Sequence, residues 1–193
     1  LKVDRANPDF EFWFLERSDG MKLVGARVTK HPDYKTVLAK GQLRPELAHL
    51  MCLISDPQSD DIVLDPLCGS GSIPIERKSL PYKKIIAGDI LPKNKEILKI
   101  DATDMLSIQN QNINKIITDP PWGISVGLSL NIPNFYFQIL TEFWRVLKPK
   151  GIAVVLVGKK DLFEKVIEKC FDKFNIDKKY DILVSGKKAA IYG

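Results

Sequence analysis

The stretch that decides the fold is Ile62-Val-Leu-Asp-Pro-Leu-Cys-Gly-Ser-Gly-Ser-Ile-Pro-Ile-Glu76, where a short apolar run leads through a glycine-containing turn into a predicted helix. The apolar residues 62–64 are typical of a buried parallel strand, which Asp65-Pro66 ends. The glycines allow the backbone to approach a ligand closely. The helix expected over residues 72–79 would present free N–H groups at the same place. Alone, this turn is a weak indication, because many strand-to-helix turns contain glycine.

Two common nucleotide-binding motifs do not fit this turn. A dinucleotide-binding fold would need glycine at the sixth position of Gly-x-Gly-x-x-Gly, where this chain has Pro74. A phosphate-binding P-loop would need Gly-Lys followed by Ser or Thr, which the sequence lacks. Both an NAD-linked oxidoreductase and a P-loop protein are therefore disfavoured.

Outward from this stretch, apolar strands alternate with amphipathic helices. The predicted strands are residues 62–64, 84–87, 96–100, 115–118 and 152–157, and the predicted helices are residues 45–54, 72–79, 134–147 and 161–171. Asn134 is expected to cap the third helix, residues 148–151 to close it, and Asp161 to begin a capping box with Glu164. Hairpins are predicted over residues 9–28 and 181–192. The alternation predicts a doubly wound α/β sheet with a parallel core.

The composition is that of an ordinary globular chain of 193 residues, with 45% hydrophobic residues and a formal net charge of +5. No apolar run is long enough to cross a bilayer, so no membrane partner is expected. The three cysteines lie far apart and form no zinc or disulfide pattern, which predicts no metal site and a reducing, cytoplasmic setting. The chain begins with Leu1 and has no secretory signal, which suggests a piece of a longer protein.

Two carboxylates follow the next predicted strands. Asp89 comes directly after residues 85–88 and is placed to accept hydrogen bonds from both hydroxyls of a ribose. Asp101, which precedes Ala102, follows residues 96–100 and could accept a hydrogen bond from an adenine amino group. Taken singly, each of these acids is more often a solvated loop residue than a ligand.

The most specific motif is Thr118-Asp-Pro-Pro-Trp-Gly123, which follows the fourth strand. Its two prolines fix the backbone and remove two N–H donors, so that local carbonyl groups lack internal partners. This combination suits a planar exocyclic amine. Asp119 and the carbonyl of Pro120 would accept its two N–H bonds, and Trp122 would stack on the ring.

In this order, Asp65-Pro-Leu-Cys-Gly-Ser-Gly71, Gly88-Asp89, Asp101-Ala-Thr103 and Asp119-Pro-Pro-Trp122 resemble class I S-adenosylmethionine-dependent amino-methyltransferases. More narrowly, the chain resembles RNA guanine-N2 methyltransferases whose catalytic domain follows an N-terminal THUMP RNA-binding domain. Residues 43–48 also match that family, and the resemblance covers residues 40–158 well and the C-terminal hairpin loosely. It implies a Rossmann-like, seven-stranded, mostly parallel sheet with helices on both faces and an antiparallel last strand.

The same resemblance implies methyl transfer from S-adenosylmethionine to the N2 amine of guanine in RNA, with tRNA as the expected substrate. The implied cofactor-binding residues are Asp65, Pro66, Cys68, Gly69, Ser70, Gly71, Asp89, Asp101 and Ala102, and the implied catalytic residues are Asp119, Pro120, Pro121 and Trp122. Residues 43–45 would lie near the methionine part of the cofactor. Residues 41–193 would form the catalytic domain and residues 1–40 a β-rich extension or connector, with a THUMP-type domain elsewhere in the full-length protein.

Some alternatives remain at this stage. The same turn serves DNA adenine-N6 and cytosine-N4 methyltransferases, and a non-catalytic RNA-binding module could keep the fold. The lysine pairs at residues 159–160, 178–179 and 187–188 could be solvated or could contact phosphates. The family has a helix between its second and third strands, whereas here only residues 90–95 separate Asp89 from the next predicted strand. A parallel crossover normally needs a dozen or more residues, so either that helix is lost or the chain omits a stretch.

Overall fold

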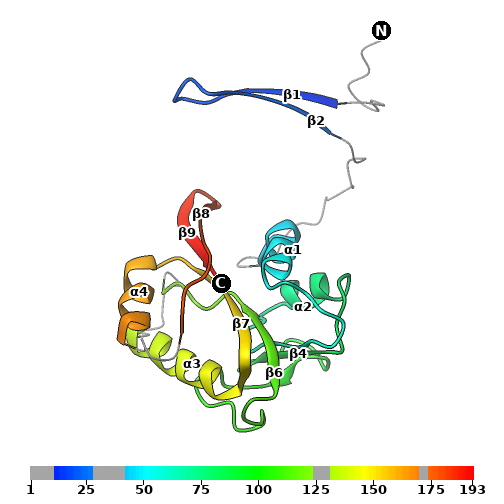
Figure 1. The fold of residues 1–193 in the computed structure, drawn as a ribbon, viewed down its shortest axis with the longest axis vertical. Helices are drawn as coiled ribbons and strands as arrows, with labels where there is room; N and C mark the ends of the chain where they lie inside the picture. Colours follow the sequence, from blue (N-terminus) through cyan, green and yellow to red (C-terminus); the bar gives the residue numbers. More distant parts are fainter. Residues whose placement is uncertain (1–10, 28–41, 124–130, 170–173) are drawn as a thin grey trace. The chain divides into compact units, whose positions relative to one another are not determined.

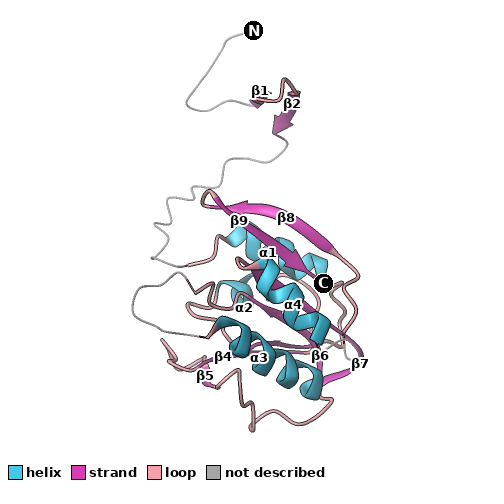
Figure 2. Cartoon of the chain, turned by 90° about the vertical axis from the view of Figure 1, so that its left-hand side faces the viewer, coloured by secondary structure: helices cyan, strands magenta, loops and turns pink. Residues whose placement is uncertain are grey.

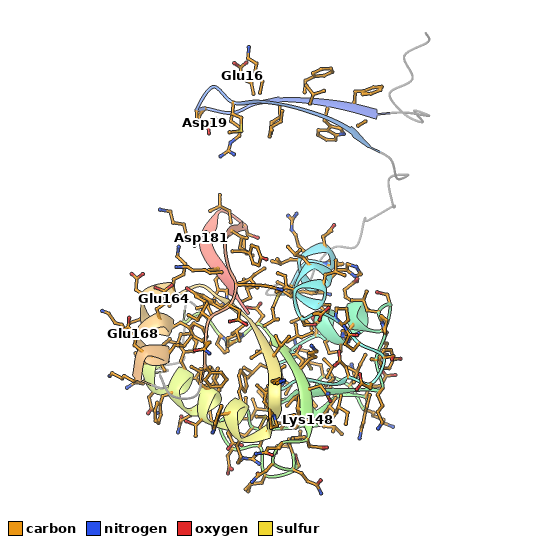
Figure 3. All side chains as sticks on the ribbon, viewed as in Figure 1. Glu16, Asp19, Lys148, Glu164, Glu168 and Asp181 are labelled. Carbon is orange, nitrogen blue, oxygen red and sulfur yellow. The ribbon has the colours of Figure 1, made fainter. Side chains whose placement is uncertain are left out.

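The computed structural model describes residues 11–27, 42–123, 131–169 and 174–193, and it contains two compact units, residues 1–37 and 38–193. The first unit contains an antiparallel hairpin of β1 (Glu11–Glu16) and β2 (Lys22–Arg27), whose turn end is marked by Glu16 and Asp19 in Figure 3. This confirms the hairpin predicted there, although its outermost residues, 9, 10 and 28, lie outside the described residues. The predicted domain boundary at residues 40 and 41 also lies outside them.

The second unit is built on a seven-stranded sheet with the order β5-β4-β3-β6-β7-β9-β8 (Figures 1 and 2). The strands are β3 (Ile62–Asp65), β4 (Lys84–Asp89), β5 (Leu98–Lys99), β6 (Ile113–Thr118), β7 (Leu147–Val157), β8 (Lys179–Val184) and β9 (Lys187–Tyr192). The strands from β5 to β7 are parallel, and β9 runs antiparallel between β7 and β8. The predicted mostly parallel sheet with an antiparallel last strand is therefore confirmed.

Helices cover both faces of this sheet. α1 (Pro45–Ile54) and α2 (Ser72–Arg77) lie on one face, and α3 (Ile132–Val146) and α4 (Lys160–Lys169) lie on the other, as Figure 1 shows. Neighbouring residues of β3 point to opposite faces: Val63 packs in the core beneath α1 and α2, and Leu64 packs in the core beneath α3 and α4. Both faces being covered explains the continuous apolar runs in the central strands, such as residues 62–64 of β3 and 152–157 of β7.

Two helix starts differ from the sequence prediction. α3 is capped by Asn131, whose side chain accepts a hydrogen bond from the backbone N–H of Asn134 at 3.2 Å, so the prediction that Asn134 is the cap was wrong. Pro133 does not delay the helix, because its missing N–H would have no partner in a first turn. α4 begins at Lys160, which places Asp161 in its first turn rather than at a cap.

Two further predictions about these helices were wrong. Residues 148–151, expected to close α3, belong to β7, which starts at Leu147 directly after the helix. Glu164 does not complete a capping box. It accepts hydrogen bonds from Lys179 at 2.6 Å and from the Tyr192 hydroxyl at 2.7 Å, which tie α4 to the last two strands. The predicted C-terminal end of α4, residues 170 and 171, lies outside the described residues.

The connection between β4 and β5 contains no helix, since residues 90–97 are described and form only turns. β5 is nevertheless parallel to β4, with Gly88 opposite Leu98 and Asp89 opposite Lys99. So short a crossover is possible because β5 pairs only with the last two residues of β4, and the chain need not return along the whole strand. No helix in the described part of the chain is long and apolar enough to span a membrane.

Candidate active site

A cavity of about 720 Å³ lies at the carboxyl ends of β3, β4 and β6, where a doubly wound sheet binds its ligands. Its lining combines the segment before α1, three strand-end turns and the tip of the last hairpin. The lining residues are Gln42, Leu43, Arg44, Asp65, Leu67, Cys68, Gly69, Ser70, Ser72, Ile73, Asp89, Ile90, Lys93, Asp119, Pro120, Pro121, Trp122, Val184, Ser185 and Lys187. The structure thus brings together most of the residues predicted from the four motifs.

Asp65, the last residue of β3, is buried and only half satisfied. Its Oδ1 accepts hydrogen bonds from the hydroxyl of Thr118 at 2.8 Å and from the N–H of Leu67 at 3.3 Å. Its Oδ2 is buried and has no partner among the described residues. Burial raises the pKa of this carboxyl to about 8, against the smaller lowering effect of the two hydrogen bonds. An unpaired acceptor in the cavity lining fits a ligand that brings an N–H donor, above all a cationic one.

The turn after β3 is fixed to the end of β4. Gly69 and Gly71 have positive φ angles of 54° and 88°, which disfavour any residue with a side chain even though a Cβ at either would have open space. The N–H of Cys68 donates to the carbonyl of Gly88, and the N–H of Gly69 donates to Oδ2 of Asp89, both at 2.9 Å. These contacts hold the predicted ribose-binding acid beside the glycine turn.

Asp89 is held by backbone donors on both of its oxygens. Besides the bond from Gly69 to Oδ2, the N–H of Leu91 donates to Oδ1 at 2.8 Å. Each carboxylate oxygen can accept a second hydrogen bond, so this oriented side chain still has capacity for two ligand hydroxyls. Ile90 and Lys93, from the connection that lacks a helix, complete this part of the lining.

The turn after β6 presents a polarised carboxylate beside an indole ring. The Nε1–H of Trp122 donates to Oδ1 of Asp119 at 2.8 Å, which leaves Oδ2 available. Burial raises the pKa of Asp119 to about 6, and the hydrogen bond from Trp122 opposes that rise. No donor in the described part of the chain reaches the carbonyl oxygen of Pro120. Two acceptors and an aromatic plane therefore lie in one short turn, as predicted.

Trp122 is held in place by a residue that the sequence analysis missed. A Cβ on Gly158, directly after β7, would lie 2.5 Å from ring carbons of Trp122, so the indole packs directly against the backbone there. The available signal was a glycine that ends a fully apolar strand. Thr118, whose hydroxyl fixes Asp65, was also missed, although it directly precedes Asp119.

Some predicted cofactor residues are not in the lining. Asp101 is exposed, and its Oδ1 accepts hydrogen bonds from the N–H of Thr103 at 2.9 Å and from its hydroxyl at 2.6 Å. Ala102 is buried in the core. Pro66 and Gly71 lie in the glycine turn but not in the cavity wall.

Cys68 does line the cavity, but it is not in the reactive form. Burial raises the pKa of its thiol to about 12. A thiol that stays protonated is a packing residue rather than a nucleophile.

The hairpin of β8 and β9 supplies a wall that the motifs did not predict. Val184, Ser185 and Lys187 lie around its tip and line the cavity together with the turn after β6. The only sequence signal was the lysine pair at residues 187–188, for which solvation and phosphate contact were equally open. The segment before α1, expected to lie near the cofactor, does line the cavity with Leu43 and Arg44.

Similarity to known proteins agrees with this geometry. The chain is 30% identical to the mouse U6 snRNA (guanine-N(2))-methyltransferase THUMPD2 over 82% of this chain and 32% of that protein. It is 22% identical to the Methanocaldococcus jannaschii tRNA (guanine(6)-N2)-methyltransferase over 100% of this chain and 65% of that protein. The chain thus spans between about a third and two thirds of these curated relatives.

A solved structure supports the fold. TrmN from Thermus thermophilus superposes with a TM-score of 0.73 at 21% identity, over 98% of this chain and 60% of that chain. The RMKL-like methyltransferase domain family, UPF0020, matches residues 32–90 and 91–186, in two segments that meet where the crossover lacks a helix. The family predicted from the motifs is confirmed, and the chain belongs to this methyltransferase domain family.

Proposed function

We propose that this chain transfers a methyl group from S-adenosylmethionine to the N2 amine of a guanine in RNA, with tRNA as the substrate. The observation that carries the proposal is the meeting in one cavity of the half-satisfied carboxylate of Asp119, the indole of Trp122 and Asp65, whose Oδ2 is buried without a partner in the described part of the chain. The two relatives named above support the reaction, because both are guanine-N2 methyltransferases by name, one for tRNA and one for U6 snRNA.

The cofactor half of the cavity fits S-adenosylmethionine, which supplies an electrophilic methyl group when bound. The buried Oδ2 of Asp65 lacks a donor, and the ammonium group of the cofactor would provide one. Asp89 is oriented by Gly69 and Leu91 and would accept the ribose hydroxyls. Asp101 retains one oxygen without a local partner and would accept the adenine amino group.

The substrate half fits a planar exocyclic amine. Oδ2 of Asp119 and the carbonyl of Pro120 would accept the two N–H bonds of the guanine amine, while Trp122 would stack on the base. Pro121 contributes by fixing the backbone of the turn. Because the amine lone pair of free guanine is delocalised into the ring, gripping both N–H groups favours a pyramidal nitrogen whose lone pair faces the methyl donor.

The proton balance also suits this turn. When the N–C bond forms, the amine nitrogen becomes cationic and acidic, and one of its protons must leave. The Oδ2 atom of Asp119 already accepts that N–H, and the raised pKa of about 6 makes this carboxylate a better proton acceptor than an ordinary aspartate while leaving it largely ionised near neutral pH. A metal ion or a covalent intermediate is not required for this step.

A longer protein would supply the rest of the RNA contacts. We infer that a THUMP-type RNA-binding domain outside this chain binds the tRNA body, since the matched relatives are much longer and one carries that domain in its name. The catalytic domain would then act on a single base extruded from the RNA into the cavity.

Labelled S-adenosylmethionine with unmodified tRNA, a U6-type snRNA and duplex DNA in parallel reactions tests the proposal. Nucleoside analysis should yield N2-methylguanosine from tRNA. Methyl groups on DNA adenine or cytosine would replace the proposal by the DNA alternative. Binding of S-adenosylmethionine, measured by calorimetry without any nucleic acid, checks the cofactor half separately, and its absence would reject that half.

A further inference from the structure

The geometry points to Lys187, at the tip of the β8–β9 hairpin, as a positioning residue that binds an RNA backbone phosphate beside the nucleotide held in the cavity. This inference rests on the proposed function and extends it to how the target nucleotide is held.

The tip of the β8–β9 hairpin extends beyond the end of β7, the neighbouring strand. The last pair between β7 and β9 joins Val157 to Ala190, so Lys187 lies three residues further on, about 10 Å along an extended strand. β7 ends where Gly158 packs against Trp122. Lys187 is accordingly found in the lining of the same cavity as Asp119 and Trp122.

The side of the hairpin that carries Lys187 is the side of the cavity. Along β9, Ala189 and Ile191 pack in the core beneath α1 and α2, whereas Ala190 and Tyr192 pack in the core beneath α3 and α4. Because side chains alternate along a strand, Lys187 lies on the face of the sheet covered by α1 and α2, and Lys188 lies on the face covered by α3 and α4. The core beneath α1 and α2 also contacts Trp122 and Val184, and Val184 is paired with Lys187 across the hairpin.

Within the described part of the chain Lys187 has no acidic partner, in contrast to Lys160 and Lys179 nearby. Lys160 pairs with Asp181 at 2.7 Å and Lys179 with Glu164 at 2.6 Å, and Figure 3 shows both acids on the side of the hairpin and α4. Among the described residues, no ion pair or hydrogen bond is found for the exposed ammonium group of Lys187. Its charge is therefore available to an anion.

The tip itself is rigidly shaped. Val184 pairs with Lys187 across a two-residue turn in which Ser185 and Gly186 both have positive φ angles, 49° and 78°. Such a turn matches the twist of the strands and fixes where the next side chain begins.

An extruded nucleotide enters the cavity base first, and its phosphates stay at the mouth. A fixed lysine at that mouth, close to the base-binding turn, is suited to hold one of them.

The test compares the full chain with three variants: Lys187→Ala, Lys187→Arg and the matched control Lys188→Ala on the opposite face. Binding to unmodified tRNA is measured at several salt concentrations, and methyl transfer is measured for KM and kcat. Lys187→Ala should raise KM for tRNA several-fold with a smaller effect on kcat. It should also make the slope of log affinity against log salt less negative by about 0.7 to 0.9, the contribution of one phosphate contact. Lys187→Arg should restore both, and Lys188→Ala should resemble the wild type.

The inference would be overturned by equal salt slopes for Lys187→Ala and Lys188→Ala, by weaker cofactor binding in Lys187→Ala, or by no RNA binding of the wild type. A slower rate with an unchanged salt slope would also reject it, because it would indicate contact with the base. The proposed function fails differently. In that case the wild type forms no N2-methylguanosine, while the salt-slope difference between the two alanine variants can still be read.

Discussion

The turns after β6 and after β5 both begin with an aspartate at a strand end, yet their surroundings differ. Asp119 lies in the cavity wall, partly buried and hydrogen-bonded by Trp122, with one oxygen and the neighbouring Pro120 carbonyl available. Asp101 is exposed outside that wall, and Thr103 satisfies one of its oxygens. The difference comes from the neighbours: β6 lies inside the sheet, whereas β5 is a two-residue edge strand. A strand-end acid acquires a chemical role only from what the adjoining strands place around it.

The largest effect should follow from removing the acceptor after β6. Asp119→Ala should lower kcat for methyl transfer by about 10²–10³-fold, the usual loss when one aligned transition-state contact is removed. Cofactor affinity should stay within a few-fold, because Asp65 and Asp89 are intact. Single-turnover rates with labelled cofactor, together with calorimetric cofactor binding, would measure both quantities.

Asp119→Asn is the matched control for this variant. It keeps an acceptor oxygen for the Trp122 N–H but loses the charge that receives the proton, so its rate should fall between those of the wild type and Asp119→Ala. Near-normal turnover in the alanine variant would remove Asp119 from the reaction.

A second prediction compares Asp89, the last residue of β4, with Asp101, which follows β5. Asp89→Ala should weaken cofactor binding by about tenfold or more, because it removes ligand contacts and also leaves the N–H groups of Gly69 and Leu91 without their acceptor. Asp101→Ala should cost less, since its carboxylate is exposed and offers one free oxygen. Calorimetry on both variants would test the order, and an equal or larger loss for Asp101 would mean that the β5 turn closes over the bound adenine.

Much of this architecture could be predicted from local sequence. The apolar runs and their flanking acids located the strands, and the Asp119–Trp122 turn was recognisable because prolines and an aromatic residue impose a local geometry. The helix starts at Ile132 and Lys160 were misplaced because several neighbouring polar residues could each have served as the cap.

Other features depended on contacts between distant parts of the chain. Gly158 supports Trp122 from the adjacent strand, and no local pattern connects the two residues. Lys187 reaches the cavity only because β9 inserts between β7 and β8 and runs past the end of β7. Asp101 had the same strand-end pattern as Asp119, and only the position of β5 at the sheet edge separates them.

A third prediction concerns the effect of Trp122 on the pKa of Asp119. Trp122→Phe keeps an aromatic plane but removes the N–H that stabilises the carboxylate, so the pKa of Asp119 should rise above about 6. Because the proposed reaction requires the ionised form to accept the amine proton, the rate of the wild type should fall as the pH drops through about 6, and that fall should begin at higher pH in the variant. At neutral pH the rate should be lower by about 2- to 10-fold, the value of one hydrogen bond.

The control for this prediction is Trp144→Phe on α3, a half-exposed tryptophan outside the cavity, for which the pH profile should match the wild type. An unchanged acid limb in Trp122→Phe would show that the hydrogen bond does not set the ionisation of Asp119.

The smallest expected effect on the reaction itself comes from the other half of the cavity, where the measured quantity is stability. Burial raises the pKa of Asp65 from its ordinary value of 3.8 to about 8, so between these values the folded protein holds a proton that the unfolded chain has lost. The free energy of unfolding therefore falls as the pH rises from about 4 to about 8, and the loss is complete above pH 8. Asp65→Asn removes this dependence and can keep the acceptor oxygen for Thr118 and Leu67.

Without cofactor, Asp65→Asn should thus melt a few degrees higher than the wild type at pH 8.5 or above, and the difference should shrink as the pH is lowered towards 5. Thermal unfolding across this pH range would measure it. With S-adenosylmethionine the order should reverse, because an ammonium group beside Oδ2 stabilises the carboxylate and not the amide. A variant that is still stabilised by the cofactor as strongly as the wild type would show that Asp65 does not face the ammonium group. The orphaned oxygen would then be a cost of the fold rather than part of the binding site.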